Sequence, residues 1–271
     1  MSFYRQIEAQ GWQLVCLGHY AGFVGWLLNR LMEESKMSHT KSNAGPFHGI
    51  KACVFDAYGT LLDVNTAALR CQDDLGEEAQ PLAELWRMKQ LQYTWLSSLM
   101  GHHRDFYEIT AMGLDFALDT LGVNDAVLRS KLMGLYEVLD AYPEVPEMLQ
   151  TLAQAGLKTA ILSNGSPAML ATAVQAAGIG GSLDAVISIE DVGIYKPAPE
   201  VYQLAVDTLE IPKEAICFVS SNGWDAMGAA AFGFQVAWIN RNGQKPETLG
   251  FPPKAELADL TPLAAMVLTS A

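Results

Sequence analysis

From residue 50 onward, short apolar runs alternate with segments of helical periodicity, which restricts the chain to a small set of α/β folds. Polar residues stand at or just after the end of each run, where a parallel sheet typically binds its ligand. The pattern predicts a Rossmann-like, doubly wound parallel sheet with helices on both faces. The expected strands are residues 51–56, 158–163, 184–189, 215–220 and 235–240, and the expected crossover helices are residues 144–155, 167–177, 199–209 and 224–232.

Between residues 65 and 142 the alternation stops, and apolar residues recur at helical spacing without a strand between them. The simplest interpretation is a helical cap subdomain, residues 65–142, inserted between the first two strands of the core. The core domain would then comprise residues 50–64 and 143–271. A ligand would be enclosed between core and cap.

The first 49 residues differ in character from the rest. Residues 12–32 are strongly apolar but contain His19 and three glycines, and residues 38–49 have the composition of a linker. Neither a membrane-spanning helix nor a secretory signal matches this pattern well. Three interpretations remain open: an extra helix that packs on the core or on a partner, a weakly membrane-associating segment, or translation that begins upstream of the native start.

Composition narrows the range of partners. The formal net charge of −13, without a basic cluster, argues against nucleic acid as a ligand. The cysteines lie far apart in the chain, which predicts buried free thiols in a reducing, cytoplasmic compartment rather than disulfides or a metal site. The adjacent histidines of the stretch HHRD lack a third ligand at useful spacing, so they do not predict a metal site either.

The stretch KACVFDAYGT places Asp56 at the end of the first expected strand, before a tight turn. A carboxylate there could act as a nucleophile or as a metal ligand, but alone it could equally cap the next helix. Further polar clusters favour a functional site, because the ends of parallel strands converge on one crevice. These clusters are Ser163 and Asn164 after the second strand, Lys196 after the third, and Ser220, Ser221, Asn222 and Asp225 after the fourth.

Five separated motifs follow one another in the chain: FDAYGTLLDV, LWRMKQLQYTWLSSLMG, LSNGSP, YKP with a tyrosine six residues beyond the lysine, and FVSSNGWDA. Together they resemble the haloacid dehalogenase superfamily, and within it the L-2-haloacid dehalogenases. The similarity runs from about residue 51 almost to the C-terminus. It implies an α/β core with a helical cap, and a hydrolase of carbon–halide bonds with Asp56 as its nucleophile.

The residue two positions after the nucleophile distinguishes branches of this superfamily. Its phosphatases carry a second aspartate there, which protonates the leaving alcohol, and a late acidic pair that holds magnesium. This chain has Tyr58, a phenol whose reference pKa of about 10 does not suit that role, and SSNGWD, in which only Asp225 is acidic. The resemblance therefore implies a site with neither metal ion nor cofactor, and a leaving group such as halide that needs no protonation.

Carried onto this chain, the family mechanism has a carboxylate oxygen of Asp56 displace halide from C2 of a short (S)-2-haloalkanoate with inversion. Water then attacks the carbonyl carbon of the resulting ester and releases an (R)-2-hydroxy acid. Lys196 is the expected partner that keeps Asp56 ionised. Asp225 resembles the residue that orients the lysine and activates the water.

The same resemblance assigns the remaining site residues. Arg87, with Asn164 beside it, would meet the leaving halide, while Ser163 and the backbone amides of the turn that begins at Ala57 would hold the substrate carboxylate. The expected apolar wall consists of Tyr58, Phe106 and Trp224, and the expected supporting polar residues are Thr60, Tyr202, Ser220 and Asn222.

Two other functions remain open. One is a magnesium-dependent phosphatase of the same fold, against which Tyr58 argues. The other is a non-catalytic binding or scaffold protein that recruits partners through the N-terminal segment, against which the intact set of polar residues argues. The apolar run YTWLSSLM is compatible with a homodimer through the cap helices, as is common in relatives of this kind.

Overall fold

The computed structural model describes residues 45–64 and 70–269. The interpretations given to residues 12–32 therefore lie outside the described residues. Within the described residues, no helix is both long enough and apolar enough to cross a membrane.

The core is one sheet of parallel strands in the order β3-β2-β1-β4-β5-β6, which confirms the predicted doubly wound α/β fold. The chain runs from β1 outward to β2 and β3 and then returns to the other side of β1 at β4. This change of direction leaves a crevice at the carboxyl end of β1. The strands are β1 (Ala52–Phe55), β2 (Lys158–Ser163), β3 (Ala185–Ser188), β4 (Ile216–Ser220), β5 (Gln235–Ile239) and β6 (Ala255–Leu257).

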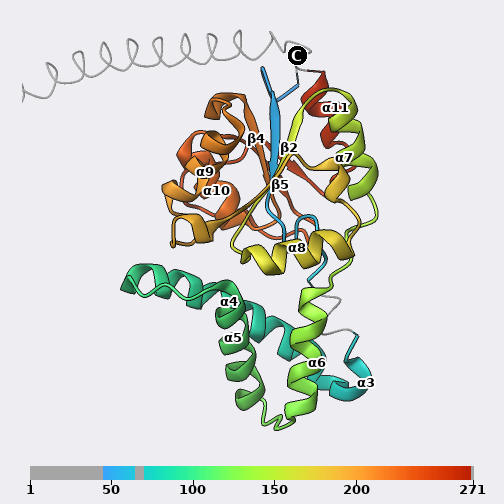
Figure 1. The fold of residues 1–271 in the computed structure, drawn as a ribbon, viewed down its shortest axis with the longest axis vertical. Helices are drawn as coiled ribbons and strands as arrows, with labels where there is room; N and C mark the ends of the chain where they lie inside the picture. The colour runs from blue at the N-terminus through green and yellow to red at the C-terminus, as the bar shows by residue number, and fades with distance from the viewer. Residues whose placement is uncertain (1–44, 65–69, 270–271) are drawn as a thin grey trace, which may run out of the picture. The chain divides into compact units, whose positions relative to one another are not determined.

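The central strands are continuous apolar runs because helices cover both faces of the sheet. Every residue of β1, β4 and β5 is buried. Helices α9 and α10 lie on one face and α7 and α11 on the other (Figure 1). The core helices are α7 (Val145–Gln154), α8 (Pro167–Ala176), α9 (Pro199–Leu209), α10 (Gly223–Phe232) and α11 (Leu263–Leu268), with 3₁₀ turns η2 (Gly180–Ser182), η3 (Ile189–Asp191) and η4 (Lys213–Ala215).

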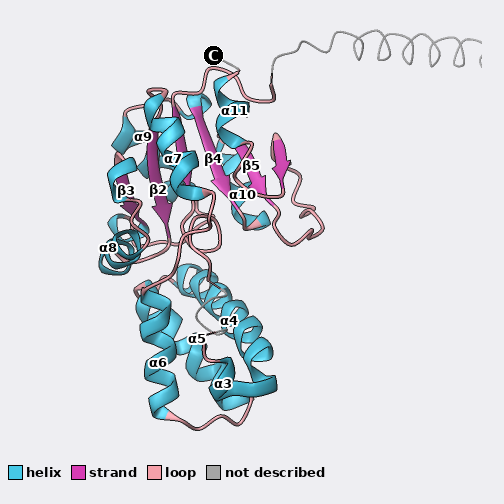
Figure 2. Ribbon diagram, turned by 90° about the vertical axis from the view of Figure 1, so that its right-hand side faces the viewer, coloured by secondary structure: helices cyan, strands magenta, loops and turns pink. Residues whose placement is uncertain are grey.

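A group of helices stands between β1 and β2 in the chain and lies beyond the carboxyl ends of the strands (Figure 2). Local signals set their ends. Asp105 accepts a hydrogen bond from the Glu108 amide before α5, Asp125 caps α6 in the same way, and Gly101 ends α4 with a left-handed φ of 65°. The helices are α3 (Gln72–Leu75), η1 (Gly76–Glu78), α4 (Ala79–Met100), α5 (Phe106–Thr120) and α6 (Ala126–Glu137).

The chain enters and leaves this helical group along two adjacent backbone segments. The Asp63 amide donates to the Asp140 carbonyl at 2.9 Å, and the Tyr142 amide donates to the Leu61 carbonyl at 3.0 Å. An isolated antiparallel bridge joins Leu62 to Ala141 between them. These paired crossings fix the helical group to the loop that follows Asp56.

One strand and two α-helices were not predicted from the sequence. Strand β6 has only three residues and its middle residue is exposed, so it lacks a run of apolar residues. Helix α11 has six residues and α3 has four, too few to establish a helical period. Elements this short depend on tertiary packing more than on local pattern.

Candidate active site

Asp56 follows β1 directly, and its carboxylate is almost fully buried. The Lys196 ammonium donates to its Oδ1 atom at 3.0 Å. Its Oδ2 atom accepts hydrogen bonds from the Thr60 hydroxyl at 3.2 Å and from the Asn222 side-chain amide at 2.9 Å. The carboxylate is thus held in one orientation by three donors from three separate segments of the chain.

Lys196 lies between two carboxylates and is itself buried. Its Nζ atom is 2.9 Å from Asp225 Oδ2 as well as 3.0 Å from Asp56 Oδ1. Burial alone would lower the pKa of Lys196, but the charges of Asp225 and Asp56 more than offset this effect and raise that pKa above its usual value. Lys196 therefore stays charged and supplies a fixed positive group beside Asp56.

Asp225 is completely buried in the first turn of α10. The Tyr202 hydroxyl donates to its Oδ1 atom at 2.8 Å, so both carboxylate oxygens are engaged. Burial raises the pKa of the Asp225 carboxyl, although Lys196 acts in the opposite direction. Burial also raises the pKa of Tyr202 well above its usual value, so the phenol remains a donor. Tyr202 thus holds Asp225 in place, and Asp225 in turn orients Lys196.

We predict that Gly228→Ala destabilises the protein by about 1–3 kcal/mol, the usual cost of overpacking. A Cβ atom at Gly228, in α10, would lie 2.6 Å from Pro197 Cβ and 2.7 Å from the Tyr202 hydroxyl oxygen. Urea denaturation measures the free energy of unfolding. Gly134→Ala in α6 is the matched control, since a Cβ atom there meets nothing within 4 Å and the helix gains up to about 1 kcal/mol. Equal free energies of unfolding for the two variants would contradict the close approach of α10 to Pro197 and Tyr202 at Gly228.

The turn after Asp56 wraps around the carbonyl of Ala57. That oxygen accepts from the amides of Thr60, Leu61 and Leu62, and the Gly59 amide donates to the Leu62 carbonyl at 2.7 Å. Gly59 has a φ of 87°, which favours glycine. The turn also brings Thr60 to Ser221, whose amide donates to the threonine hydroxyl at 2.8 Å. The amides of Ala57 and Tyr58 are not among the donors used inside this turn.

Arg87 reaches the site from α4 in the helical group. Its Nη2 atom donates to the Asn222 side-chain oxygen at 3.3 Å, and its Nη1 atom donates to Gln90 Oε1 at 2.7 Å. Asn222 therefore bridges the guanidinium and the Asp56 carboxylate, with its oxygen toward Arg87 and its nitrogen toward Asp56. The side-chain amides that Arg87 contacts are these two and not Asn164, and its guanidinium also interacts with the Tyr136 hydroxyl.

Tyr58 and Phe106 form an aromatic wall next to the carboxylate. Their ring centroids are 5.6 Å apart, and Tyr136 stacks on Tyr58 at 5.5 Å. The Tyr58 hydroxyl is buried and has no hydrogen-bond partner among the described residues. Burial raises the pKa of this phenol, with Tyr136 and Asp56 acting in the same direction. Tyr58 therefore remains neutral, with a hydroxyl that still has a proton to donate.

The other predicted residues lie around this centre. The Ser163 hydroxyl oxygen accepts from the Gly165 amide, which leaves its proton available to donate. The Asn164 side-chain oxygen accepts from the Lys196 amide at 3.2 Å, and the Ser220 hydroxyl oxygen accepts from the Asn222 amide. These contacts position the loops that carry Lys196 and Asn222.

Trp224 stands further out than the rest of the predicted wall. Its half-buried ring meets Trp95 edge-on at 5.3 Å and lines an apolar hollow of about 470 Å³ together with Pro197 and Met227.

Sequence reasoning missed Gln90 and Tyr136. Both are buried and both contact residues that were predicted, Arg87 and Tyr58. Gln90 stands three positions after Arg87, so it lies on the same helical face, and a glutamine at a buried position needs polar partners. That spacing was the one signal in the sequence that could have found it.

The described residues contain no group of three His, Cys, Asp or Glu side chains that could hold a metal ion. His103, one of the two adjacent histidines, instead contacts Glu190 at 2.8 Å. At the centre of the site the Lys196 ammonium occupies the space between the two carboxylates. The two carboxylates at the centre of the site therefore already share a cation, the ammonium group of Lys196.

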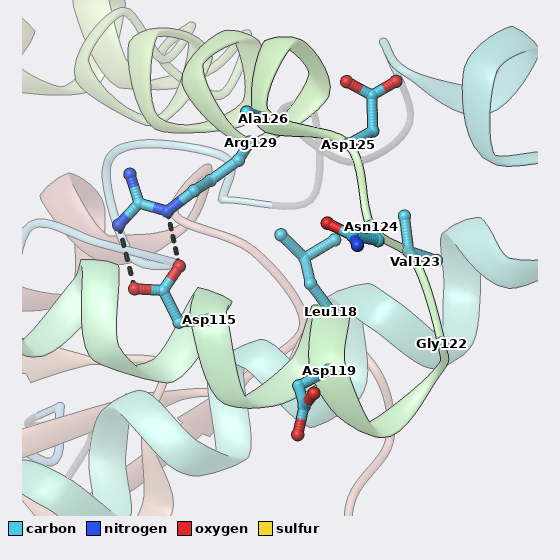
Figure 3. A pocket seen from close by; sticks show the side chains of 9 residues that line it. All are labelled: Asp115, Leu118, Asp119, Gly122, Val123, Asn124, Asp125, Ala126 and Arg129. Carbon is cyan, nitrogen blue, oxygen red and sulfur yellow. Dashed lines mark hydrogen bonds and ion pairs between the residues drawn. The ribbon is translucent and has the colours of Figure 1, made fainter.

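A separate hollow of about 390 Å³ lies between α5 and α6, where Arg129 reaches across to Asp115 (Figure 3). Its other polar lining residues are acidic or neutral, and include Asp119 and Asn124. None of the predicted site residues lines it. The hollow belongs to the packing of the helical group and has no connection with Asp56.

The order of the parallel strands and the buried Asp56 at the tip of β1 place the chain among open α/β proteins whose ligand site lies at the carboxyl ends of the strands. The model for haloacid dehalogenase-like hydrolases matches residues 50–233, and the chain belongs to this family. The match confirms the resemblance inferred from the motifs.

Two curated relatives are similar over nearly their whole length. The chain is 46% identical to (S)-2-haloacid dehalogenase 1 of Pseudomonas sp. strain CBS-3 over 220 residues, which cover 81% of this chain and 97% of that protein. It is 45% identical to (S)-2-haloacid dehalogenase 4A of Burkholderia cepacia over 226 residues, which cover 82% and 98%.

A solved structure gives the same likeness in three dimensions. It is the L-2-haloacid dehalogenase from Xanthobacter autotrophicus with chloropropionic acid covalently bound. The TM-score is 0.77 at 36% sequence identity, and the match covers 82% of this chain and 100% of that chain.

Proposed function

We propose that this protein hydrolyses short (S)-2-haloalkanoic acids to (R)-2-hydroxy acids through an ester formed on Asp56. The observation that carries the proposal is the Asp56 carboxylate, buried at the tip of β1 and held by Lys196, Thr60 and Asn222. The identity of 46% with an (S)-2-haloacid dehalogenase over 97% of that protein supports the same substrate class.

In the first step a carboxylate oxygen of Asp56 forms a bond to C2 of the substrate, and the carbon–halide bond breaks with its electron pair leaving on the halide. In-line attack inverts C2. We assign Arg87, together with Asn164, to the departing halide, because a guanidinium stabilises developing negative charge. The substrate carboxylate is assigned to the Ser163 hydroxyl and to the amides of Ala57 and Tyr58.

In the second step water attacks the carboxyl carbon of Asp56, and cleavage of the ester releases the hydroxy acid with one proton. Lys196 stabilises the negative charge that develops on the carboxyl oxygen during this attack. We assign Asp225 to the orientation of Lys196 and, since each carboxylate oxygen can accept a second hydrogen bond, to the activation of water. Tyr202 keeps Asp225 in place.

We further propose that residues 65–142 act as a cap that encloses the substrate, since Arg87 and Phe106 both come from this segment. Exposed apolar side chains on α4, among them Leu96, Leu99 and Met100, support a homodimer through the cap. The free thiols Cys53, Cys71 and Cys217 support a reducing, cytoplasmic compartment.

The expected result with the separate enantiomers of 2-chloropropionate is chloride release from the S form, at least about a hundredfold faster than from the R form. Excess EDTA should leave the rate unchanged, because Lys196 supplies the cation of the site. Chloride is measured together with the chirality of the lactate produced. Activity restored only by magnesium, with hydrolysis of phosphate esters, would instead support the phosphatase.

A further inference from the structure

Arg87 is fixed on one side by a residue that no step of the proposed reaction uses. Gln90 stands one turn further along α4, and its Oε1 atom accepts from Arg87 Nη1 at 2.7 Å. On the other side Arg87 Nη2 donates to Asn222 at 3.3 Å. Of these two amide contacts, one within the cap and one with the core, the contact with Gln90 is the shorter, and the Tyr136 hydroxyl also interacts with the guanidinium.

The orientation of the Gln90 amide is determined by its buried neighbours. Gln90 is only 1% exposed, and its Nε2 atom donates to Thr110 Oγ1 at 2.7 Å. The Thr110 hydroxyl donates its own proton to the Phe106 carbonyl at 2.6 Å, so it can only accept from Gln90. A flipped amide would point its NH₂ group at the guanidinium and leave two donors facing each other. The Oε1 atom must therefore face Arg87.

A third helix completes the network. The Tyr136 hydroxyl of α6 lies 3.0 Å from Gln90 Nε2 and 3.2 Å from Oε1. Burial raises the pKa of Tyr136, partly opposed by Arg87, so the phenol stays protonated. Its ring stacks on Tyr58, two residues after Asp56. The network therefore ties α4, α5 and α6 together at the point nearest the site.

Packing leaves little freedom for these groups to move. Gly113 allows α5 to approach α4 so closely that a Cβ atom there would lie 3.1 Å from the backbone nitrogen of Gln90. Trp86 donates to the Thr110 carbonyl at 2.8 Å and so anchors the same turn. Because a buried, fully partnered amide is costly to rearrange, it can hold a flexible arginine in one orientation.

We propose that Gln90 is a positioning residue that holds the Arg87 guanidinium where it meets the leaving halide. The inference rests on the proposed function, in which Arg87 stabilises that halide. Gln90 itself touches neither substrate nor the reacting atoms. Loss of its acceptor oxygen frees the guanidinium, and the interaction lost is one that is strongest in the transition state of carbon–halide cleavage.

Gln90→Leu tests this role, because it keeps the volume and removes the acceptor. The expected result is a fall of about tenfold to a hundredfold in kcat with (S)-2-chloropropionate, the effect of one charge-assisted hydrogen bond. The fall with (S)-2-bromopropionate is smaller, since bromide is the better leaving group. In Arg87→Lys, which lacks the planar fork, adding Gln90→Leu changes kcat less than about threefold.

Thr94→Val is the matched control. Thr94 is buried on the same helix and donates to the Leu91 carbonyl, so this variant loses a buried hydroxyl without a contact to Arg87. Its chloride-to-bromide ratio of kcat should equal that of the wild type. A Gln90→Leu variant with an unchanged ratio, or with an effect that multiplies that of Arg87→Lys, has a merely structural defect and overturns the proposal.

A readout without turnover separates this inference from the proposed function. The ¹⁵Nε–H signal of Arg87, assigned by its loss in Arg87→Lys, should report a rigid side chain in the wild type and a mobile one in Gln90→Leu. An equally rigid signal in both overturns the positioning role. A wild type that releases no halide overturns the proposed function and the halide role of Arg87, while the signal still decides whether Gln90 orients the guanidinium.

Discussion

Asp56→Asn is expected to release halide from (S)-2-chloropropionate at least about a thousandfold more slowly than the wild type. An amide oxygen is a far weaker nucleophile than a carboxylate, and the substitution changes neither size nor shape. The side-chain oxygen of the introduced amide can still accept from Lys196 or from Thr60 and Asn222, but its NH₂ group then faces the donor on the other side, so only part of these contacts is retained. The rates of halide release by the two proteins are compared at saturating substrate by direct measurement of chloride.

Rapid acid quenching followed by mass spectrometry distinguishes loss of the nucleophile from a general loss of structure. During turnover the wild type should contain a species heavier by the carboxyalkyl group of the substrate, and Asp56→Asn should contain none. The exposed Asp207, which accepts a hydrogen bond from the Gln203 side chain on its own helix, provides the control. Asp207→Asn should behave as the wild type in both assays. A variant at position 56 that retains a tenth of the activity would assign the nucleophile elsewhere.

The position of Asp56 could be predicted because the physical signal is local. A strand buried on both faces is a continuous apolar run, so its end is visible where the run stops. Parallel connection then brings the ends of β2 and β4 to the same edge without any knowledge of side-chain contacts. For this reason the sheet and the gathering of Lys196, Asn222 and Asp225 around Asp56 followed from pattern alone.

Contacts between the helical group and the sheet domain could not be predicted in the same way. Nothing in the sequence indicates that Asn222 accepts from Arg87, 135 positions away, while it donates to Asp56. The Gln90 network also depends on how closely α4, α5 and α6 pack, which Gly113 permits. Such contacts depend on the relative placement of segments that are distant in the sequence, and periodicity carries no information about it.

Lys196→Met is expected to abolish measurable halide release and to lower the free energy of unfolding at pH 7 by about 3–5 kcal/mol. Methionine fills a similar volume but leaves the carboxylates of Asp56 and Asp225 facing each other without a counter-ion. Lys213→Met is the control, because Lys213 is only partly buried and donates to a carbonyl and not to a carboxylate. Its effect on stability should stay below about 1 kcal/mol.

The pH dependence of the Lys196→Met variant tests the electrostatic cause of that loss. Burial raises the pKa of Asp225 even in the wild type, and the variant lacks the lysine that opposes this shift. A carboxyl whose folded-state pKa is raised stabilises the fold fully below its unfolded value near ~3.9 and less as pH rises through the folded value. The loss in free energy of unfolding relative to the wild type should therefore grow from pH 4 to pH 8 in urea denaturation.

Adding Asp225→Asn to Lys196→Met removes one buried charge and should recover about half of this loss at pH 8. A loss that does not depend on pH would mean that lost packing, and not unpaired charge, destabilises the variant.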